Sequence, residues 1–187
     1  MARIKAIIVV CLFISLNFVF CGERYVNNGD GTVTDMKTGL MWAQKDSYSE
    51  TGQSLAWVQM KKYVAELRTG GYDDWRIPTL EQLKTLYDPV FSVKSCVLQD
   101  GVIRDLHFSP LFAAGGAVVY LSSDEKKKPY WFSDKNDVGF YVFSFANEKS
   151  GPIHVKTPAK PKLGCGIRAV RLANVSALNR NVLNTQK

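Results

Sequence analysis

The sequence predicts an α+β domain in which two amphipathic helices pack on one side of a mostly antiparallel sheet. Three observations predict this class. Turn signals beside β-branched residues near the start of the chain indicate a hairpin, two later segments have a helical period, and several short apolar runs follow them. Helices that precede a series of short strands are typical of an α+β domain.

The first 22 residues have the order of an export signal. Arg3 and Lys5 give a basic start, an apolar run over 6–20 follows, and the segment ends on the small residues Cys21 and Gly22. The apolar run has 15 residues, fewer than the roughly 20 that cross a bilayer. We therefore expect a signal peptide, and after its removal a periplasmic, secreted or outer-surface protein with no transmembrane helix.

A lipid anchor on Cys21 is the alternative fate of this leader. Bacterial lipoprotein signals require a small residue before the anchored cysteine, and Phe20 stands at that place, which disfavours lipidation. The rest of the chain has the ordinary length of one domain. We predict a domain over 23–172 and a flexible polar tail over 173–187, where no clear period is present.

The stretch "NNGDGTVTDMKTGLMW" at 27–42 resembles a calcium loop in its density of carboxylates and amides. If Gly31 is placed at the sixth position of such a loop, Val26 and Lys37 fall where oxygen donors are needed. The alternative explains every position: Asp30-Gly31 is a strong turn signal, and apolar and β-branched residues follow on both sides of a second turn. We predict an N-terminal hairpin, and neither a metal nor a cofactor.

Two helices are predicted next. Segment 55–68 has apolar residues at steps of three and four, which is the spacing of one helix face. Ser54 is the expected N-cap of this helix, and the glycine pair at 70–71 is the expected stop. The second helix is predicted to begin after Thr79, with Gln82 completing a capping box.

Apolar runs separated by polar turns predict the strands of the sheet. The runs are 117–123, 129–134, 139–145, 151–155 and 165–172. The last run contains Arg168 and Arg171, which we expect to be structural and to pair with acids such as Asp73 or Asp74.

The tryptophans are expected to serve mainly in packing. Trp42, Trp57 and Trp75 occupy positions that fit a buried interior. Trp131, between two other aromatic residues, is the one we assign as a candidate for stacking on a sugar ring.

Two cysteines remain once the leader is removed. Cys96 and Cys165 would then face an oxidising compartment, where pairing is the usual outcome, so a disulfide between them is predicted. Two unpaired buried thiols are the alternative.

Charge is distributed unevenly along the chain. Residues 23–148 contain 14 Lys and Arg against 17 Asp and Glu, whereas residues 149–187 contain eight cations and no carboxylate. This asymmetry indicates a polyanionic partner. Nucleic acid is excluded as that partner because an exported protein does not meet it.

Two lysine-rich loops are the predicted ligand-binding positions. They contribute the residues Lys126, Lys127, Lys128, Lys156, Lys160 and Lys162. A polysaccharide that carries sulfate or carboxylate groups needs several cations on one surface, because each exposed contact is weak. The alternative is that both loops are ordinary solvated turns between strands.

No catalytic residue is predicted. His107 and His154 each stand alone in an apolar setting, where a histidine is more often packed than reactive. The sequence also has no nucleophile elbow, zinc-binding helix motif or phosphate-binding glycine loop.

Four segments together resemble the Lcl C-terminal-domain family, first named on a bacterial collagen-like adhesin. They are "NGDGTVTDMKTGLMW", "GGYDDWRIPTLEQLKTL", "YWFSD…FYVFSF" and "CGIRAVR". The resemblance covers about 25–172. More distantly, "RIPT" and "GIRAVR" are similar to formylglycine-generating enzymes, which have C-type-lectin-like folds, but the pair of reactive cysteines of those enzymes is absent.

The resemblance implies a C-type-lectin-like α+β domain on an exported envelope protein. It also implies an adhesin-like role, since relatives form trimeric heads that bind sulfated glycosaminoglycans. The collagen-like repeat that would hold three chains together is absent here, as are the "EPN" and "QPD" tripeptides of calcium-dependent lectins. We therefore expect a non-enzymatic module for anionic glycans, and a structural or protein-interaction domain of the envelope remains the alternative.

Overall fold

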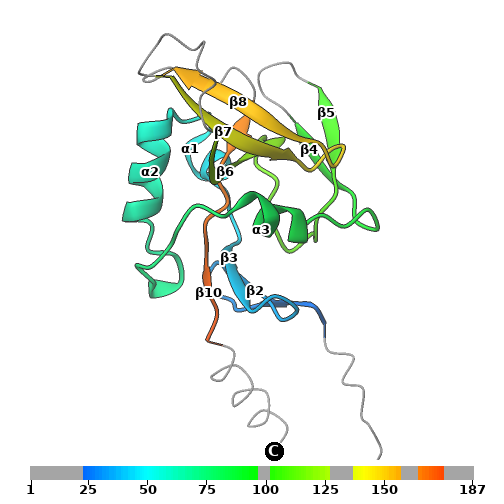
Figure 1. Ribbon diagram of the computed structural model, residues 1–187. Helices are drawn as coiled ribbons and strands as arrows, with labels where there is room; N and C mark the ends of the chain where they lie inside the picture. Colours follow the sequence, from blue (N-terminus) through cyan, green and yellow to red (C-terminus); the bar gives the residue numbers. More distant parts are fainter. Residues whose placement is uncertain (1–22, 97–101, 127–136, 157–163, 175–187) are drawn as a thin grey trace, which may run out of the picture.

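The computed structural model describes residues 23–96, 102–126, 137–156 and 164–174 (Figure 1). The described strands form three sheets. The first, here called the terminal sheet, has the order β1-β2-β3-β10 and comprises Tyr25–Asn27, Thr32–Asp35, Leu40–Ala43 and Val170–Leu172. The second, the meander sheet, has the order β8-β7-β6-β9 and comprises Ser150–Lys156, Asp137–Ser144, Val119–Lys126 and Cys165–Gly166. A two-stranded sheet pairs β4 (Val93–Cys96) with β5 (Ile103–Leu106).

The α+β class and the antiparallel character of the sheets are confirmed. All pairs of neighbouring strands are antiparallel except β6 and β9. The helices are α1 (Ser47–Thr51), α2 (Trp57–Glu66), the 3-10 turn η1 (Thr69–Gly71) and α3 (Leu80–Thr85). No helix in the described part of the chain is long and apolar enough to cross a membrane.

The predicted N-terminal hairpin is confirmed. The Asp30 carboxylate accepts hydrogen bonds from the backbone N and the hydroxyl of Thr32, at 3.0 and 2.6 Å, and so shapes the turn between β1 and β2. Gly31 follows at a φ of 83°, a conformation that glycine adopts without steric cost. In β2, Val33 pairs with Trp42 of β3, and both are fully buried.

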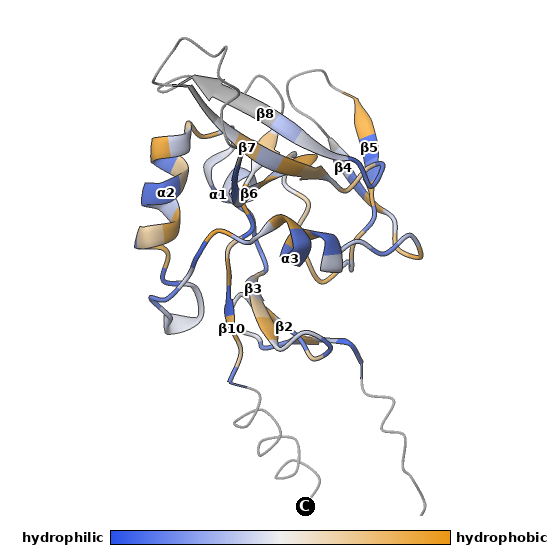
Figure 2. Cartoon of the chain, viewed as in Figure 1, coloured by the Kyte–Doolittle hydropathy of each residue, from blue (hydrophilic) through white to orange (hydrophobic). Residues whose placement is uncertain are grey.

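The two predicted helices are confirmed, but the predicted N-cap of the first, Ser54, is wrong. Thr79 and Gln82 form the expected capping box of α3. Ser54 does not cap α2; its hydroxyl accepts from the Cys165 backbone N at 3.1 Å, and the Gln59 side chain binds the N-cap residue Ala56 instead. Helix α2 ends at Glu66, before the glycine pair at 70–71. Figure 2 shows that α2 and α3 each carry both hydrophobic and hydrophilic residues.

The interior has two hydrophobic clusters, and strand β3 contributes to both. Leu40 and Trp42 belong to the first cluster, and Met41 and Ala43 belong to the second, because successive side chains of a strand point to opposite faces. Trp42 is 0% exposed and Trp75 is 6% exposed, so their predicted place in the core is confirmed.

The helices pack on opposite faces of the meander sheet, and the prediction that they share one side is wrong. Trp57 of α2 contacts Phe140, with ring centroids 3.8 Å apart, whereas Tyr87, just after α3, contacts Phe143 at 6.0 Å. Phe140 and Phe143 are three positions apart on β7 and therefore point to different faces. The physical reason is that β7 has apolar side chains on both faces, so each face needs its own cover.

Three of the five predicted strand runs correspond to single strands of the structure. Runs 117–123, 139–145 and 151–155 correspond to β6, β7 and β8, and run 129–134 lies outside the described residues. Run 165–172 is not one strand. It divides into β9, which joins the meander sheet, and β10, which joins the terminal sheet, and Val170 of β10 also forms a bridge with Arg76.

Candidate functional site

The end of the meander sheet where β6 and β8 finish and β7 begins carries the predicted lysine-rich loops. Lys126 pairs with Gly139, and Lys156 pairs with Asp137. The connections 127–136 and 157–163 therefore both leave the sheet at one end. From Lys126 to Asp137 and from Lys156 to residue 163, the sequence has seven lysines and two aspartates.

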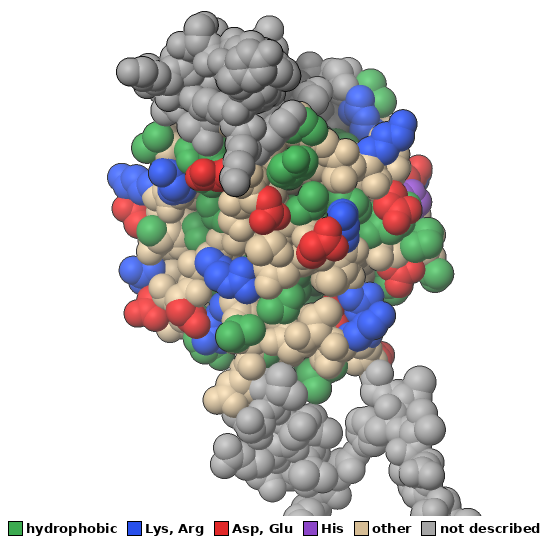
Figure 3. Space-filling model, viewed as in Figure 1, with side chains coloured by type: hydrophobic (Ala, Val, Ile, Leu, Met, Phe, Trp, Pro, Cys, Tyr) green, Lys and Arg blue, Asp and Glu red, His purple; other side chains and the backbone are tan. Residues whose placement is uncertain are grey.

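Most of the predicted ligand-binding residues lie in these connections. Lys127, Lys128, Trp131, Lys160 and Lys162 are outside the described residues. The remaining two residues are the last residues of strands: Lys126 ends β6 and Lys156 ends β8. Both strands pair with β7 in the meander sheet. On the face of the molecule in Figure 3, by contrast, cations and carboxylates are interspersed.

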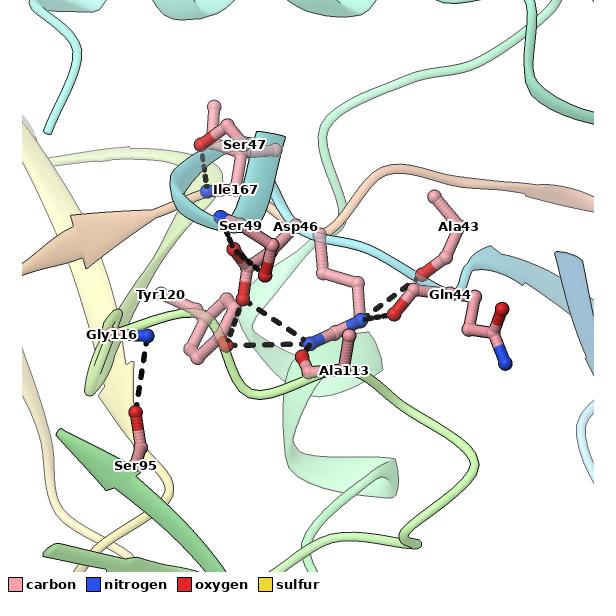
Figure 4. Close-up of polar contacts among 11 residues, drawn as sticks. Ala43, Gln44, Asp46, Ser47, Ser49, Ser95, Ala113, Gly116, Tyr120 and Ile167 are labelled. Carbon is pink, nitrogen blue, oxygen red and sulfur yellow. Dashed lines mark hydrogen bonds and ion pairs between the residues drawn. The ribbon is translucent and has the colours of Figure 1, made fainter. Parts of the chain in front are cut away.

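A second polar cluster lies in the interior, around Arg168. Figure 4 labels its partners Asp46 and Ala113. Arg168 is 1% exposed, and its Nη1 donates to the carbonyl oxygens of Ala43, at 3.1 Å, and of Gln44. Its Nη2 donates to the Ala113 carbonyl oxygen at 2.9 Å and to Asp46 Oδ2 at 3.3 Å. Arg168 was expected to pair with Asp73 or Asp74; the buried Asp46 is the carboxylate that the fold places beside it.

Asp46 joins this cluster to helix α1. One carboxylate oxygen caps α1 by accepting from the Ser49 backbone N at 2.7 Å, and the other accepts from the Tyr120 hydroxyl and from Arg168. Burial raises the pKa of the Tyr120 hydroxyl well above its usual value, and the Asp46 charge acts in the same direction. The guanidinium also lies 5.4 and 5.0 Å from the ring centres of Phe108 and Phe112.

These contacts make the Arg168 cluster a structural element of the fold. Both carboxylate oxygens of Asp46 and both terminal nitrogens of Arg168 take part in hydrogen bonds. The side chains of Asp46, Arg168 and Tyr120 are each at most 1% exposed. The cluster connects three distant segments of the chain. Arg171, in contrast, pairs with Asp74 near the surface, with Nε 2.5 Å from Oδ1, as predicted.

Comparison with known proteins identifies the family of this chain. The sequence profile described as the Lcl C-terminal domain matches residues 31–171. The chain belongs to this family. No curated protein and no solved structure matches the chain. The matched range includes the Arg168 cluster and both lysine-rich connections of this Lcl C-terminal domain.

The predicted disulfide is not found in the Lcl domain. Cys165 is a free thiol, 1% exposed, in the second hydrophobic cluster, where burial raises its pKa to about 12. It pairs with Val119 across the meander sheet, whereas Cys96 ends β4 and pairs with Ile103 in the two-stranded sheet. The two cysteines are thus built into different sheets, which the linear sequence does not show.

The two histidines and Trp57 are the remaining residues for which the sequence predicted a role. His107 Nδ1 lies 2.7 Å from the Phe91 carbonyl oxygen, and its ring meets Tyr87 edge-on at 5.7 Å, so it is packed as expected. The side chain of His154 is outside the described part. Trp57 is only partly buried, at the margin of the second cluster, so its predicted place in the core is only partly correct.

One hollow was not predicted from the sequence. It has a volume of about 410 Å³ and lies beside β1. It is lined by Glu23, Arg24, Tyr25, Asp88, Phe91, Ser109, Pro110 and Leu111. These residues come from three separate segments, and no local sequence signal brings them together.

The charges of this N-terminal hollow do not suit an anionic ligand. Glu23 and Asp88 contribute two carboxylates. Arg24, the one cation among the lining residues that the structure describes, is already paired with Asp35 at 2.9 Å. The Tyr25 hydroxyl is buried and has no hydrogen-bond partner among the described residues. The described part of the chain also contains no group of three or more His, Cys, Asp or Glu that could hold a metal ion.

Proposed function

We propose that this chain is an exported, adhesin-like module of the bacterial cell envelope that binds sulfated or otherwise anionic glycans. The observation that supports it most is the strand register: Lys126 and Lys156 end strands on either side of β7, so both lysine-rich connections start at one end of one sheet. Cations from two loops can then act together on one polymer, and their weak individual contacts add.

Binding rather than catalysis is supported by the state of the residues that chemistry would use. The buried cluster engages Arg168, Asp46 and Tyr120 in contacts that hold the fold. The Cys165 thiol is buried and its pKa is raised to about 12, so little thiolate forms near neutral pH. The envelope location is part of the proposal, and it is supported by the predicted export signal over 1–22 and by the family of the domain.

A structural or protein-interaction role in the envelope is the alternative function. The N-terminal hollow favours it, because apolar residues line it and Val90, adjacent to Phe91 in the sequence, is 85% exposed. A protein partner with a basic or apolar segment would fit its carboxylates and its apolar lining better than a polyanion would.

The first prediction tests the proposed function directly. The exported protein should be retained on immobilised heparin, a sulfated polysaccharide, at low salt and released as the salt concentration rises, because exposed charge pairs are screened. Neutral dextran should not retain it. Passage through the heparin column without delay at low ionic strength would contradict glycan binding and favour the alternative.

A further inference from the structure

Helix α2 begins beside the lysine-rich end of the meander sheet. Its first residue, Trp57, packs on Phe140, with ring centroids 3.8 Å apart and planes inclined by 36°. Phe140 is next to Gly139, which pairs with Lys126 at the end of β6. Figure 1 shows α2 on the same side of the molecule as the end of β8. Trp57 therefore packs on the β7 residue that follows Gly139, and Gly139 pairs with Lys126, the last residue before the first lysine-rich connection.

The first turn of α2 presents an aromatic ring and a cation together. Trp57 is partly exposed, and the exposed Lys61, one turn further along, places its Nζ 5.6 Å from the centre of the indole ring. The neighbouring Val58 is 54% exposed, so the surface here is apolar as well as basic. An indole ring packs well on the apolar C–H face of a sugar, and an ammonium group one turn away can meet a sulfate on the same sugar.

We propose that Trp57 and Lys61 form a sugar-binding subsite on α2 for a sulfated pyranose unit, with stacking on the indole and an ion pair to Lys61. This subsite rests on the proposed function and extends it from the lysine-rich loops to the described surface of α2. It commits the ligand class to sulfated polysaccharides whose sugar rings are accessible, rather than to any polyanion.

Substitution of one carboxylate beside the subsite should have the opposite effect on binding affinity. Glu125 is exposed and pairs directly with Phe140 across β6 and β7, so it projects from the same face of the sheet. A sulfated ligand at Trp57 would be repelled by this carboxylate. Removal of its charge should therefore strengthen binding, whereas removal of the Lys61 charge should weaken it.

The test measures the dissociation constant of the exported protein for a heparin-derived hexasaccharide by titration calorimetry. We expect Lys61→Gln and Trp57→Phe each to weaken binding by about twofold to fivefold, and Glu125→Gln to strengthen it by about twofold. Lys94→Gln is the matched control, since Lys94 is exposed on β4 in the two-stranded sheet, and should leave the constant unchanged. Indole emission should change when the hexasaccharide binds to the wild type, and by a smaller amount in Trp57→Phe.

The outcomes separate the subsite from the proposed function. If the wild type binds and both Trp57→Phe and Lys61→Gln bind equally well, the subsite is wrong while the glycan function stands. If the wild type does not bind, the glycan function is wrong and the subsite with it. Lys61 and Glu125 are exposed, so their substitution leaves the fold intact, as a common urea midpoint should verify.

Discussion

Arg168→Met should destabilise the protein by about 3–5 kcal/mol, as removal of one partner from a buried ion pair usually does. The Asp46 carboxylate, 0% exposed, would remain in the interior without its cation. The carbonyl groups of Ala43 and Ala113 would lose a charged donor at the same time. The free energy of unfolding from urea titration, followed by circular dichroism, measures the effect.

Arg171→Met is the matched control for this prediction. It removes the same side chain three residues later in the sequence, but the Asp74 side chain that pairs with Arg171 is 55% exposed. Water can solvate that carboxylate after the substitution, so the loss should be about 0–1 kcal/mol. Equal losses in the two variants would show that the Arg168 cluster does not hold the three segments together.

The second large effect concerns the lysine-rich connections. Replacement of all six predicted lysines with Gln should weaken heparin binding by roughly 1–6 kcal/mol in total, so by at least about fivefold. The six are Lys126, Lys127, Lys128, Lys156, Lys160 and Lys162. The physical reason is that each exposed contact contributes little and the six act on one polymer. Titration calorimetry with the same hexasaccharide at low salt gives the comparison.

A charge-matched variant controls for net charge alone. Six other exposed lysines of the described chain are Lys37, Lys45, Lys62, Lys84, Lys94 and Lys149. Their replacement with Gln removes the same total charge from other parts of the surface and should weaken binding much less. A similar loss in both variants would mean that heparin responds to overall charge, and that no particular end of the sheet binds it.

Local signals account for the parts of the fold that the sequence predicts correctly. The Asp30-Gly31 turn, the period of α2 and the capping box of Thr79 each depend on residues close together in the chain. Helix α1 was missed because it has five residues, too few to establish a period, and its cap, Asp46, is also part of the Arg168 cluster.

The contacts that join distant segments could not be predicted in the same way. Asp46 and Arg168 are 122 positions apart, and no periodicity relates them. Ser54 has the local signature of a helix cap, yet its hydroxyl binds the Cys165 backbone 111 positions away. The division of run 165–172 between two sheets has the same cause, since only the tertiary fold decides where Arg168 lies.

The candidate site stays a prediction from the sequence, and the structure adds where its two connections begin. Lysine spacing identified both connections, and the register of β6, β7 and β8 places their starting points together. The proposed contribution of α2 was not predicted from the sequence, because Trp57 lies on the apolar face of a helix, a position that usually indicates burial. Its partial exposure depends on how the first turn of the helix packs against Phe140.

Residue-resolved mapping tests most directly the claim that a closed interior supports a glycan site at one end of the meander sheet. Amide resonances of the isotope-labelled protein would be followed while the heparin hexasaccharide is added. We expect shifts at the adjoining ends of β6, β7 and β8 and in the first turn of α2, with Arg168 and its neighbours unchanged. Shifts concentrated at the hollow of Glu23, Tyr25 and Asp88, or spread evenly over the surface, would contradict it.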